Sequence, residues 1–329
     1  MVSWIAGFTI LIVKLAIVLL FLVGAAAYLV WVERKFLARL QVRYGPNRAG
    51  PFGLLQPLAD VVKMIAKEDT VPEGADRVLF LLAPAVVAAT AFLMFSVVPF
   101  GKDLTLWGKS IPLVVTDLNI GLLFVFAMSS LGVYGVALGG WASNSKYGLL
   151  GGIRGAAQMI SYELSLGLSL VPVVMLAHSF SIMDIVQAQA KYPFILVQPV
   201  AFLIFIISAM AESKRIPFDL PEAENELVAG FHTEYSGMRF GLFFLGEYVH
   251  IIVFGGIVSV LFLGGWRGPW LPPIAWILIK IFLVALFMIW VRGTLPRLRY
   301  DQLMALGWKV LIPLALLNIL ATAVVGLLV

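Results

Sequence analysis

Hydrophobic residues fill long runs of this chain, and polar residues gather between the runs. Eight runs are about 18 residues or longer, enough for a helix to cross ~30 Å of hydrocarbon. We therefore predict an all-α polytopic membrane protein with about eight transmembrane helices in a single membrane domain, residues 1–329. The approximate limits of the runs are 4–31, 78–99, 118–140, 156–177, 194–211, 238–263, 274–291 and 306–328.

Basic residues alternate from loop to loop. Loops after odd-numbered spans carry most of the Lys and Arg, and basic loops remain in the cytoplasm. We therefore predict cytoplasmic odd loops and extracytoplasmic N- and C-termini, and the net charge of +5 indicates topology rather than nucleic-acid binding. The basic residues of the even loops are Lys102, Lys109, Lys191 and Arg267.

Composition narrows the chemistry further. Hydrophobic residues make up 61% of the sequence and charged residues 12%, so lipid must cover much of the surface. The sequence contains no cysteine, which excludes disulfides, thiolate zinc sites and iron-sulfur ligation. Three scattered histidines do not suggest a haem pair, and we predict no metal site. Any electron carrier must therefore lie on another chain.

Two cytoplasmic loops, near 33–77 and 212–237, are long enough to form a docking surface. Within the first loop, 53–67 has helical periodicity and predicts an amphipathic helix at the membrane interface, beside the bundle. Periodicity alone leaves a second possibility, a loop helix that only packs against the protein. The apolar stripe contains Leu54, Leu55, Leu58, Val61, Val62 and Ile65, opposite Asp60, Lys63 and Lys67.

Carboxylates form a line from the cytoplasmic face toward the middle of the membrane. Glu163 and Glu247 lie eight or nine residues into their spans, a depth of ~12 Å at 1.5 Å per residue. Such a line predicts a proton half-channel, because adjacent buried acids share protons. It has no visible exit, so we expect protons or charge to pass sideways to a neighbouring subunit. The other members are Glu212, Asp219, Glu222, Glu224, Glu226 and Glu234.

Alternatives remain open for several intramembrane residues. Glu163 and Glu247 are either functional acids or structural acids paired with Arg or Lys. His250, one turn from Glu247, is either a proton relay or a core histidine. Lys14 and Lys280 are either counter-charges to the glutamates or side chains that snorkel to the interface.

Several motifs are long and specific enough to identify a family. They extend over the whole chain, and they resemble the H subunit of bacterial NADH:quinone oxidoreductase, whose mitochondrial counterpart is NADH dehydrogenase subunit 1. The motifs are Glu33-Arg34-Lys35, Arg43-Tyr44-Gly45-Pro46-Asn47-Arg48, Gln56-Pro57-Leu58-Ala59-Asp60, the stretch 211–235 and the stretch 290–303.

The resemblance implies a quinone chamber at the junction with peripheral subunits, and an acidic path like the one inferred from depth. The quinone is a substrate that bonds to a peripheral subunit, so no catalytic residue is expected here. The implied chamber residues are Arg34, Arg43, Asp60, Phe218, Asp219 and Phe231, and the implied proton path is Glu212, Asp219, Glu222, Glu224, Glu226 and Glu234, leading to Glu163 and Glu247.

The resemblance also implies partners. NADH, FMN and iron-sulfur clusters would lie on partner subunits, and no cofactor would be bound covalently. The chain would join peripheral iron-sulfur and quinone-site subunits with antiporter-like and small membrane subunits, in a hetero-oligomer of the bacterial cytoplasmic (inner) membrane that is inactive as an isolated chain. Two alternatives stay open: the membrane anchor of an energy-converting hydrogenase, and a secondary ion transporter. A donor other than NADH is also possible.

Overall fold

A computed structural model describes residues 2–101, 103–106 and 109–328. Seven of the described helices are long and apolar enough to cross a membrane, and an eighth, α8, is apolar but shorter. The predicted all-helical polytopic fold is confirmed. The long helices are α1 Val2–Leu40, α3 Arg77–Phe95, α4 Gly121–Ala142, α5 Lys146–Ala177, α10 Gly237–Phe262, α11 Pro273–Thr294, and a C-terminal helix made of α12 Tyr300–Ala305, a π-helical segment Leu306–Leu311 and α13 Ile312–Leu328.

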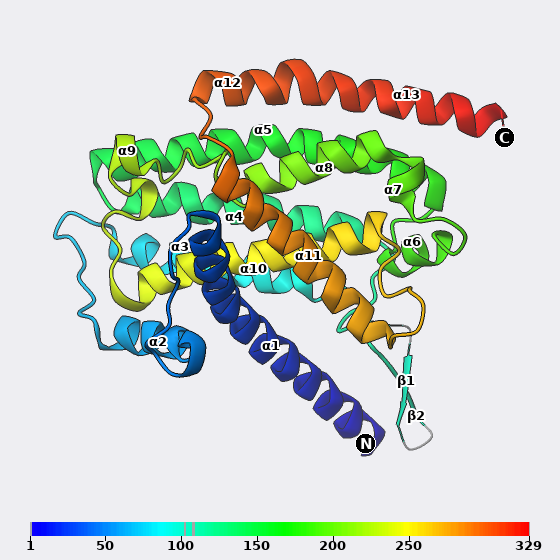
Figure 1. The fold of residues 1–329 in the computed structure, drawn as a ribbon, viewed down its shortest axis with the longest axis horizontal. Helices are drawn as coiled ribbons and strands as arrows, with labels where there is room; N and C mark the ends of the chain where they lie inside the picture. The colour runs from blue at the N-terminus through cyan, green and yellow to red at the C-terminus, as the bar shows by residue number, and fades with distance from the viewer. Residues whose placement is uncertain (1, 102, 107–108, 329) are drawn as a thin grey trace.

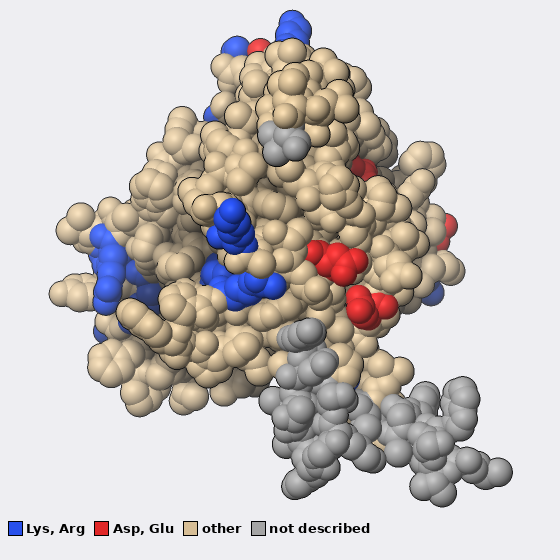
Figure 2. All heavy atoms as spheres, turned by 90° about the vertical axis from the view of Figure 1, so that its right-hand side faces the viewer, with Lys and Arg blue, Asp and Glu red and all other residues tan. Residues whose placement is uncertain are grey.

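The helices form one bundle, in which α3, α4, α5, α8 and α10 run side by side while α1 and α11 cross them obliquely (Figure 1). The loops that carry α2 Gln56–Ala66 and α9 Glu224–Leu227 lie at one end. The start of α1, the end of α13 and α6 Ile182–Ala188 lie at the other end, as the predicted topology requires. Most of the surface of that second end is neither basic nor acidic (Figure 2). We refer to the two ends as cytoplasmic and extracytoplasmic, following the charge distribution.

Helix α10 lies at the centre of the bundle. Each of its residues from Gly246 to Phe262 is buried, since a helix that is apolar on all sides must be covered all round. It packs against α1, α3 and α11. Gly246 permits a close approach to α3, because a Cβ atom there would lie 2.8 Å from the side chain of Val87. Polar residues of α10 are therefore held inside the protein.

The fifth span differs from its prediction. Instead of one helix over 194–211, the chain forms α7 Phe194–Val197 and α8 Pro199–Glu212, with a break at Gln198. Proline lacks a backbone N–H and disfavours helical geometry in the residue before it. At 14 residues, α8 is only ~21 Å long.

Several helices extend beyond the predicted limits. Helix α1 continues to Leu40, α5 begins at Lys146 rather than 156, and the last span begins at Tyr300 rather than 306. Lys and Arg have good helix propensity, so a helix does not end where its sequence leaves the hydrocarbon. Glu33, Arg34 and Arg154 consequently lie on helices rather than in loops.

The amphipathic helix is confirmed as α2, preceded by a 3₁₀ turn at Pro51–Gly53. The possibility that it only packs against the protein is wrong, because its apolar stripe is exposed, from 39% at Leu54 to 65% at Ile65. The opposite side of α2, including the buried Pro57, contacts α1 and α10. An exposed apolar stripe at a helix-bundle end suits the membrane interface.

Short elements outside the bundle add to the prediction. An antiparallel hairpin joins β1 Asp103–Leu106 to β2 Lys109–Pro112 at the extracytoplasmic end. A 3₁₀ turn, Gly230–His232, follows α9 at the cytoplasmic end. These elements leave the all-helical membrane part unchanged.

Candidate functional site

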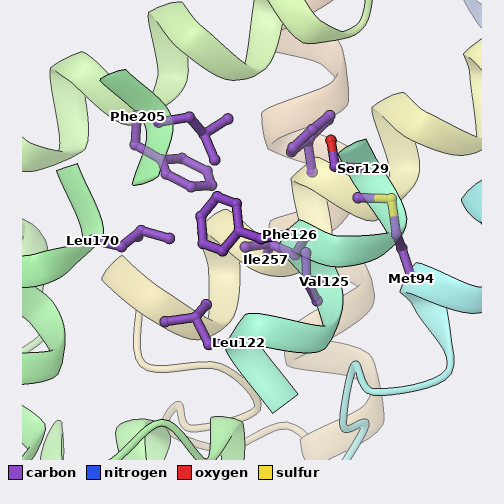
Figure 3. A pocket seen from close by; sticks show the side chains of 10 residues that line it. Met94, Leu122, Val125, Phe126, Ser129, Leu170, Phe205 and Ile257 are labelled. Atoms are coloured by element: carbon purple, nitrogen blue, oxygen red, sulfur yellow. The ribbon is translucent and has the colours of Figure 1, made fainter. Parts of the chain in front are cut away.

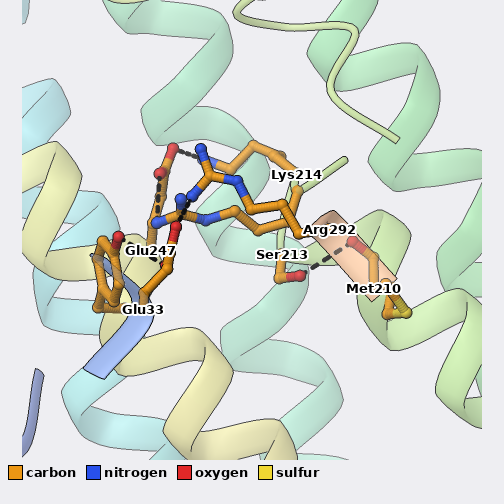
Figure 4. Close-up of polar contacts among 8 residues, drawn as sticks. Glu33, Met210, Ser213, Lys214, Glu247 and Arg292 are labelled. Carbon is orange, nitrogen blue, oxygen red and sulfur yellow. Dashed lines mark hydrogen bonds and ion pairs between the residues drawn. The ribbon is translucent and has the colours of Figure 1, made fainter. Parts of the chain in front are cut away.

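Two buried cations face one buried carboxylate at the cytoplasmic end of the bundle. Lys214 Nζ lies 3.7 Å and Arg215 Nη2 lies 3.4 Å from the carboxylate oxygens of Glu247 on α10 (Figure 4). The side chains of Lys214, Arg215 and Glu247 are 2%, 7% and 4% exposed. Buried charges require such compensation, since removal from water is costly. The ion-pair alternative therefore holds for Glu247.

Local geometry brings the two cations to this place. Helix α8 ends at Glu212, and Lys214 takes a left-handed φ of 55°, which turns the chain back into the bundle. The guanidinium of Arg215 lies 4.3 Å from the ring centroid of Tyr248, and the ammonium of Lys214 lies 5.0 Å from that of Phe231. Aromatic faces attract cations, so the rings hold both side chains in position.

Two loop carboxyls adjoin Glu247. Glu222 shares a hydrogen bond with Glu247, and burial together with the charge of Glu247 raises the pKa of Glu222 well above its ordinary value. Burial also raises the pKa of Asp219 to about 6, as does Glu247, while Arg297, Arg292 and Arg215 oppose the increase. Glu222 is therefore the group that carries the proton in its hydrogen bond to Glu247. We call Lys214, Arg215, Glu222 and Glu247 the central cluster.

A second ion pair lies beside the central cluster. Arg292 of α11 donates to Glu33 of α1, and the hydroxyl of Tyr248 donates to the other Glu33 oxygen at 2.9 Å. Glu33 is 5% exposed. Tyr248 thus contacts Glu33 directly and Arg215 through its ring, which links the pair to the cluster.

The deepest carboxylates are held by two consecutive serines of α4. Ser129 donates to Glu212 at 2.8 Å, and Ser130 donates to Glu163 of α5. One helix therefore connects an acid of α8 with an acid of α5, and Glu163 bonds to a hydroxyl rather than to a cation. The charges of Glu163 and Lys214 both act on Glu212, and Lys214 also acts on Glu247. Lys214 is therefore the electrostatic link between the central cluster and the deep acids.

A glutamine ties the loop to the bundle. The side-chain amide of Gln158, on α5, donates to the carbonyl oxygens of Ala211 and Phe218, both at 2.7 Å. Gln158 is fully buried. Because the two acceptors flank the segment that carries Lys214 and Arg215, movement of that segment is coupled to α5.

The carboxylate line ends on apolar side chains. A cavity of about 10 Å³ lies beside Ser129, the polar member of a lining that is otherwise apolar (Figure 3). That volume holds about one water molecule at most, and an apolar hole of this size stays dry. We call this lining the apolar floor: Met94, Leu122, Val125, Phe126, Leu166, Leu170, Phe205, Phe254 and Ile257.

The remaining predicted acids lie farther out. Glu224 and Glu226 are exposed, and Glu234 is half-buried. Glu226 accepts from Arg154 at 2.7 Å and lies 3.7 Å from Arg297; the hydrogen bond from Arg154 lowers the pKa of Glu226. The predicted path therefore has three levels: exposed acids, the central cluster, and the deep pair Glu163 and Glu212.

The predicted chamber residues separate into two groups. Arg34 and Asp60 form an ion pair at 2.8 Å that joins α1 to α2, with 44% and 21% of the side chains exposed. Arg43 is also exposed. Phe218 and Phe231, in contrast, are buried. The first group offers a surface to another molecule, whereas the two aromatic rings support the loop from inside.

The structure bears on the alternatives that the sequence left open for Lys14, Lys280 and His250. Lys14 donates to the carbonyls of Pro112 and Val114, and Lys280 donates to three carbonyls at the end of α10, so neither lysine is a counter-charge to the glutamates. His250 is buried, its ring is stacked at 6.2 Å from Phe254, and its Nδ1 has no hydrogen-bond partner among the described residues. A buried Nδ1 without a partner does not fit a hydrogen-bonded core histidine, so the proton-relay alternative stays open for His250.

Part of the site is not predicted by the sequence. Glu33 follows an apolar run and stands out only as a motif residue, while Ser129 and Ser130 carry no signal within an apolar span. Arg215 and Arg292 have the appearance of ordinary loop charges. Polarity close to a span end is the one signal that Glu33 and the two arginines share.

Comparisons with known proteins agree with these features. The family model described as NADH dehydrogenase matches residues 13–323. An H subunit of NADH-quinone oxidoreductase from Syntrophobacter fumaroxidans is 80% identical, over 98% of this chain and 97% of its own length. The H subunit from Syntrophotalea carbinolica is 64% identical over 95% of both chains. The one from Thermomicrobium roseum is 52% identical over 99% of this chain and 96% of its own length.

Proposed function

Because this chain belongs to the NADH dehydrogenase family as the H subunit of NADH:quinone oxidoreductase (complex I), we propose that its central cluster couples quinone reduction to proton movement. The chain is a multi-pass component of a bacterial membrane enzyme. Because the chain is 80% identical to an H subunit of NADH-quinone oxidoreductase, we do not retain the two alternative functions, the hydrogenase anchor and the free-standing transporter.

One observation carries the proposal: titratable side chains connect the cytoplasmic loop to the middle of the membrane. Glu222 shares a proton with Glu247, and Lys214 acts electrostatically on both Glu247 and Glu212. Ser129 and Ser130 then connect Glu212 with Glu163. Ion pairing of Glu247 does not remove it from this path, since the pairing lets the cluster change its protonation without leaving a bare charge.

Reduction of a quinone consumes two electrons and two protons at the cytoplasmic interface. Negative charge arriving there favours proton uptake by nearby carboxyls, because a like charge raises their pKa. Asp219, with a pKa of about 6, is the group placed to take up a proton, and the already protonated Glu222 is placed to pass its proton to Glu247. A proton gained by Glu247 would free Lys214 to interact with Glu212. The apolar floor would then direct the charge sideways to Glu163 rather than straight across the membrane.

Partner subunits supply the remaining chemistry. We assign NADH, FMN and the iron-sulfur clusters to them; for the clusters, this chain has no cysteine thiolate to offer. We propose that Arg34, Arg43 and Asp60 form a wall of the quinone chamber shared with the peripheral subunits, because they are exposed or half-buried at the cytoplasmic end. Phe218 and Phe231 position the loop behind that wall.

The test replaces Glu222 by glutamine in the assembled complex. An amide keeps a hydrogen bond to Glu247 but cannot release a proton. Quinone-linked NADH oxidation should fall by about two orders of magnitude, the scale of a lost acid–base group. NADH oxidation by hexacyanoferrate, measured on the same membranes, should be unchanged.

The matched control is Glu224→Gln, in the same loop but exposed. It should retain most of the quinone-linked turnover. Equal losses in the two variants, or normal turnover in Glu222→Gln, would contradict the proposed coupling role. Loss of the hexacyanoferrate activity as well would indicate failed assembly, and Glu222→Asp, which retains a carboxyl, would then decide whether the acid is needed.

A further inference from the structure

A second cavity lies at the opposite end of the bundle, away from the central cluster. It has a volume of about 310 Å³ and lies between α1, α11 and the chain that follows β2. Figure 1 shows the outer halves of α1 and α11 beside this hairpin. Its volume is within the range of ~300–1,000 Å³ that holds small ligands. We call it the outer cavity.

The surface of the outer cavity is apolar, and Lys14 is the one charged residue among those that line it. Ile17, Val18 and Phe21 line it from α1, while Ile274 and Leu278 line it from α11. Apolar cavities do not fill with ordered water, because water there finds no hydrogen-bond partners. The surface of α1 next to the cavity is also apolar and exposed, so the cavity is continuous with the surface that faces lipid. A hydrocarbon chain is the occupant that such a lining favours.

Lys14 gives the outer cavity its charge. Its stem lines the cavity, and its ammonium donates to the carbonyl oxygens of Pro112 at 2.9 Å and Val114 at 3.4 Å. An ammonium has three N–H donors, so one donor is left. Among the side chains that the structure describes, no Asp or Glu forms an ion pair with Lys14. The remaining N–H donor gives Lys14 the means to bind an anionic group.

The depth of Lys14 fits a lipid headgroup. Trp31, whose ring is typical of the membrane interface, lies 17 residues further along α1, which is ~26 Å at 1.5 Å per residue. That separation approaches the ~30 Å thickness of the hydrocarbon layer. If Trp31 lies at the cytoplasmic interface, Lys14 lies near the extracytoplasmic one, at the level of lipid phosphates.

From this geometry we propose that the outer cavity binds an anionic phospholipid of the extracytoplasmic leaflet. One acyl chain lies between α1 and α11, and the phosphate accepts from Lys14. The bound lipid fills the space between two helices that otherwise diverge from the bundle. No step of the proposed proton path depends on it.

The test uses photo-crosslinking in the purified complex, reconstituted in nanodiscs of phosphatidylglycerol and phosphatidylcholine. Benzoylphenylalanine replaces Ile17 in the cavity or, as the matched control, Leu20, which is 75% exposed on the same helix and does not line the cavity. Mass spectrometry identifies the adducts. The ratio of phosphatidylglycerol to phosphatidylcholine adducts should be about fivefold higher from position 17 than from position 20, the factor expected for one lysine near an anionic lipid.

Four further variants sharpen the result. Lys14→Ala should reduce the ratio at position 17 to that at position 20, while Lys14→Arg should preserve the enrichment. Val18→Phe, which fills the cavity, should lower the yield of all lipid adducts at position 17. Lys191→Ala, at another extracytoplasmic lysine, should change nothing.

Equal ratios at the two positions in the otherwise wild-type complex would overturn the proposal. A protein adduct at position 17 would overturn it too, since a helix of another subunit would then occupy the cavity. Because the crosslinking probe leaves Lys14 intact, this outcome can be read even if the Lys14 variants fail to assemble.

Discussion

Charged side chains are held in different ways at the two ends of the bundle. At the cytoplasmic end, Lys214 and Arg215 face a carboxylate, and that carboxylate shares a hydrogen bond with another acid. At the extracytoplasmic end, Lys14 and Lys280 donate to backbone carbonyls, which cannot titrate. Side-chain partners can exchange protons and change charge, whereas carbonyls only hold a cation in place. The comparison supports the proposal that the side chains which change protonation lie in the cytoplasmic half.

The largest expected effect comes from Glu247→Gln. It leaves Lys214 and Arg215 buried without a carboxylate, and breaking a buried pair in this way costs about 3–5 kcal/mol. Less assembled complex and loss of inhibitor-sensitive NADH:quinone turnover are expected, measured by native gel electrophoresis and by quinone-linked assay. Asp301→Asn is the control, because its pair with Arg299 is exposed and worth about 0–1 kcal/mol. Similar behaviour of the two variants would remove the distinction between buried and surface pairs.

Lys280→Met tests the extracytoplasmic half. Three carbonyl oxygens, those of Leu263, Gly265 and Arg267, lose their common donor. Part-buried acceptors that lose their donor should cost less than the about 1–3 kcal/mol of fully buried ones, and the complex should inactivate at a moderately lower temperature. The surviving enzyme should keep its proton-to-electron ratio, measured in proteoliposomes. A changed ratio would show that this half also takes part in coupling.

Ser129→Ala examines the deep end of the acid line. One oxygen of Glu212 already lacks a hydrogen-bond partner among the described residues, and this substitution removes the partner of the other. Quinone-linked turnover should fall by about tenfold, the equivalent of one buried hydrogen bond. Ser143→Ala provides the matched control, since its hydroxyl donates to the carbonyl of Gly140 and not to an acid. Identical turnover in the two variants would place Ser129 outside the path.

Asp219→Asn should produce the smallest effect on stability, and this effect should depend on pH. Burial raises the pKa of Asp219 to about 6, above its unfolded value near 3.8, so the protonated form is favoured in the folded protein. The protonated Asp219 carboxyl makes a contribution to the free energy of unfolding that is fully present below about pH 3.8 and is lost as pH rises to about 6. The stability advantage of the variant over the wild type should therefore grow across this window and stay constant above it. Thermal inactivation at several pH values measures the difference, and a difference that does not vary with pH would contradict the raised pKa.

The approximate number and positions of the spans could be predicted from the sequence alone, and the same sequence predicts their orientation. Hydropathy and loop charge are local properties, and each helix satisfies its own backbone hydrogen bonds in lipid. For the same reason, counting residues along each span predicted that Glu163 and Glu247 lie well inside helices, as they do in α5 and α10. The order of motifs along the chain was also sufficient to identify the family.

The partners of these acids were decided only by the tertiary structure. Arg292 and Glu33 are 259 residues apart in sequence, and Ser129 and Glu212 are 83 apart. Whether such side chains meet depends on how helices pack and cross, which no local periodicity encodes. The break at Gln198 depends on both the sequence and the tertiary structure. Pro199 predisposes the chain to the break, and hydrogen bonds with Asn318 and Thr322 on α13 satisfy the side chain of Gln198. A line of acids could therefore be predicted, whereas the identity of its fixed and responsive members follows from three-dimensional contacts.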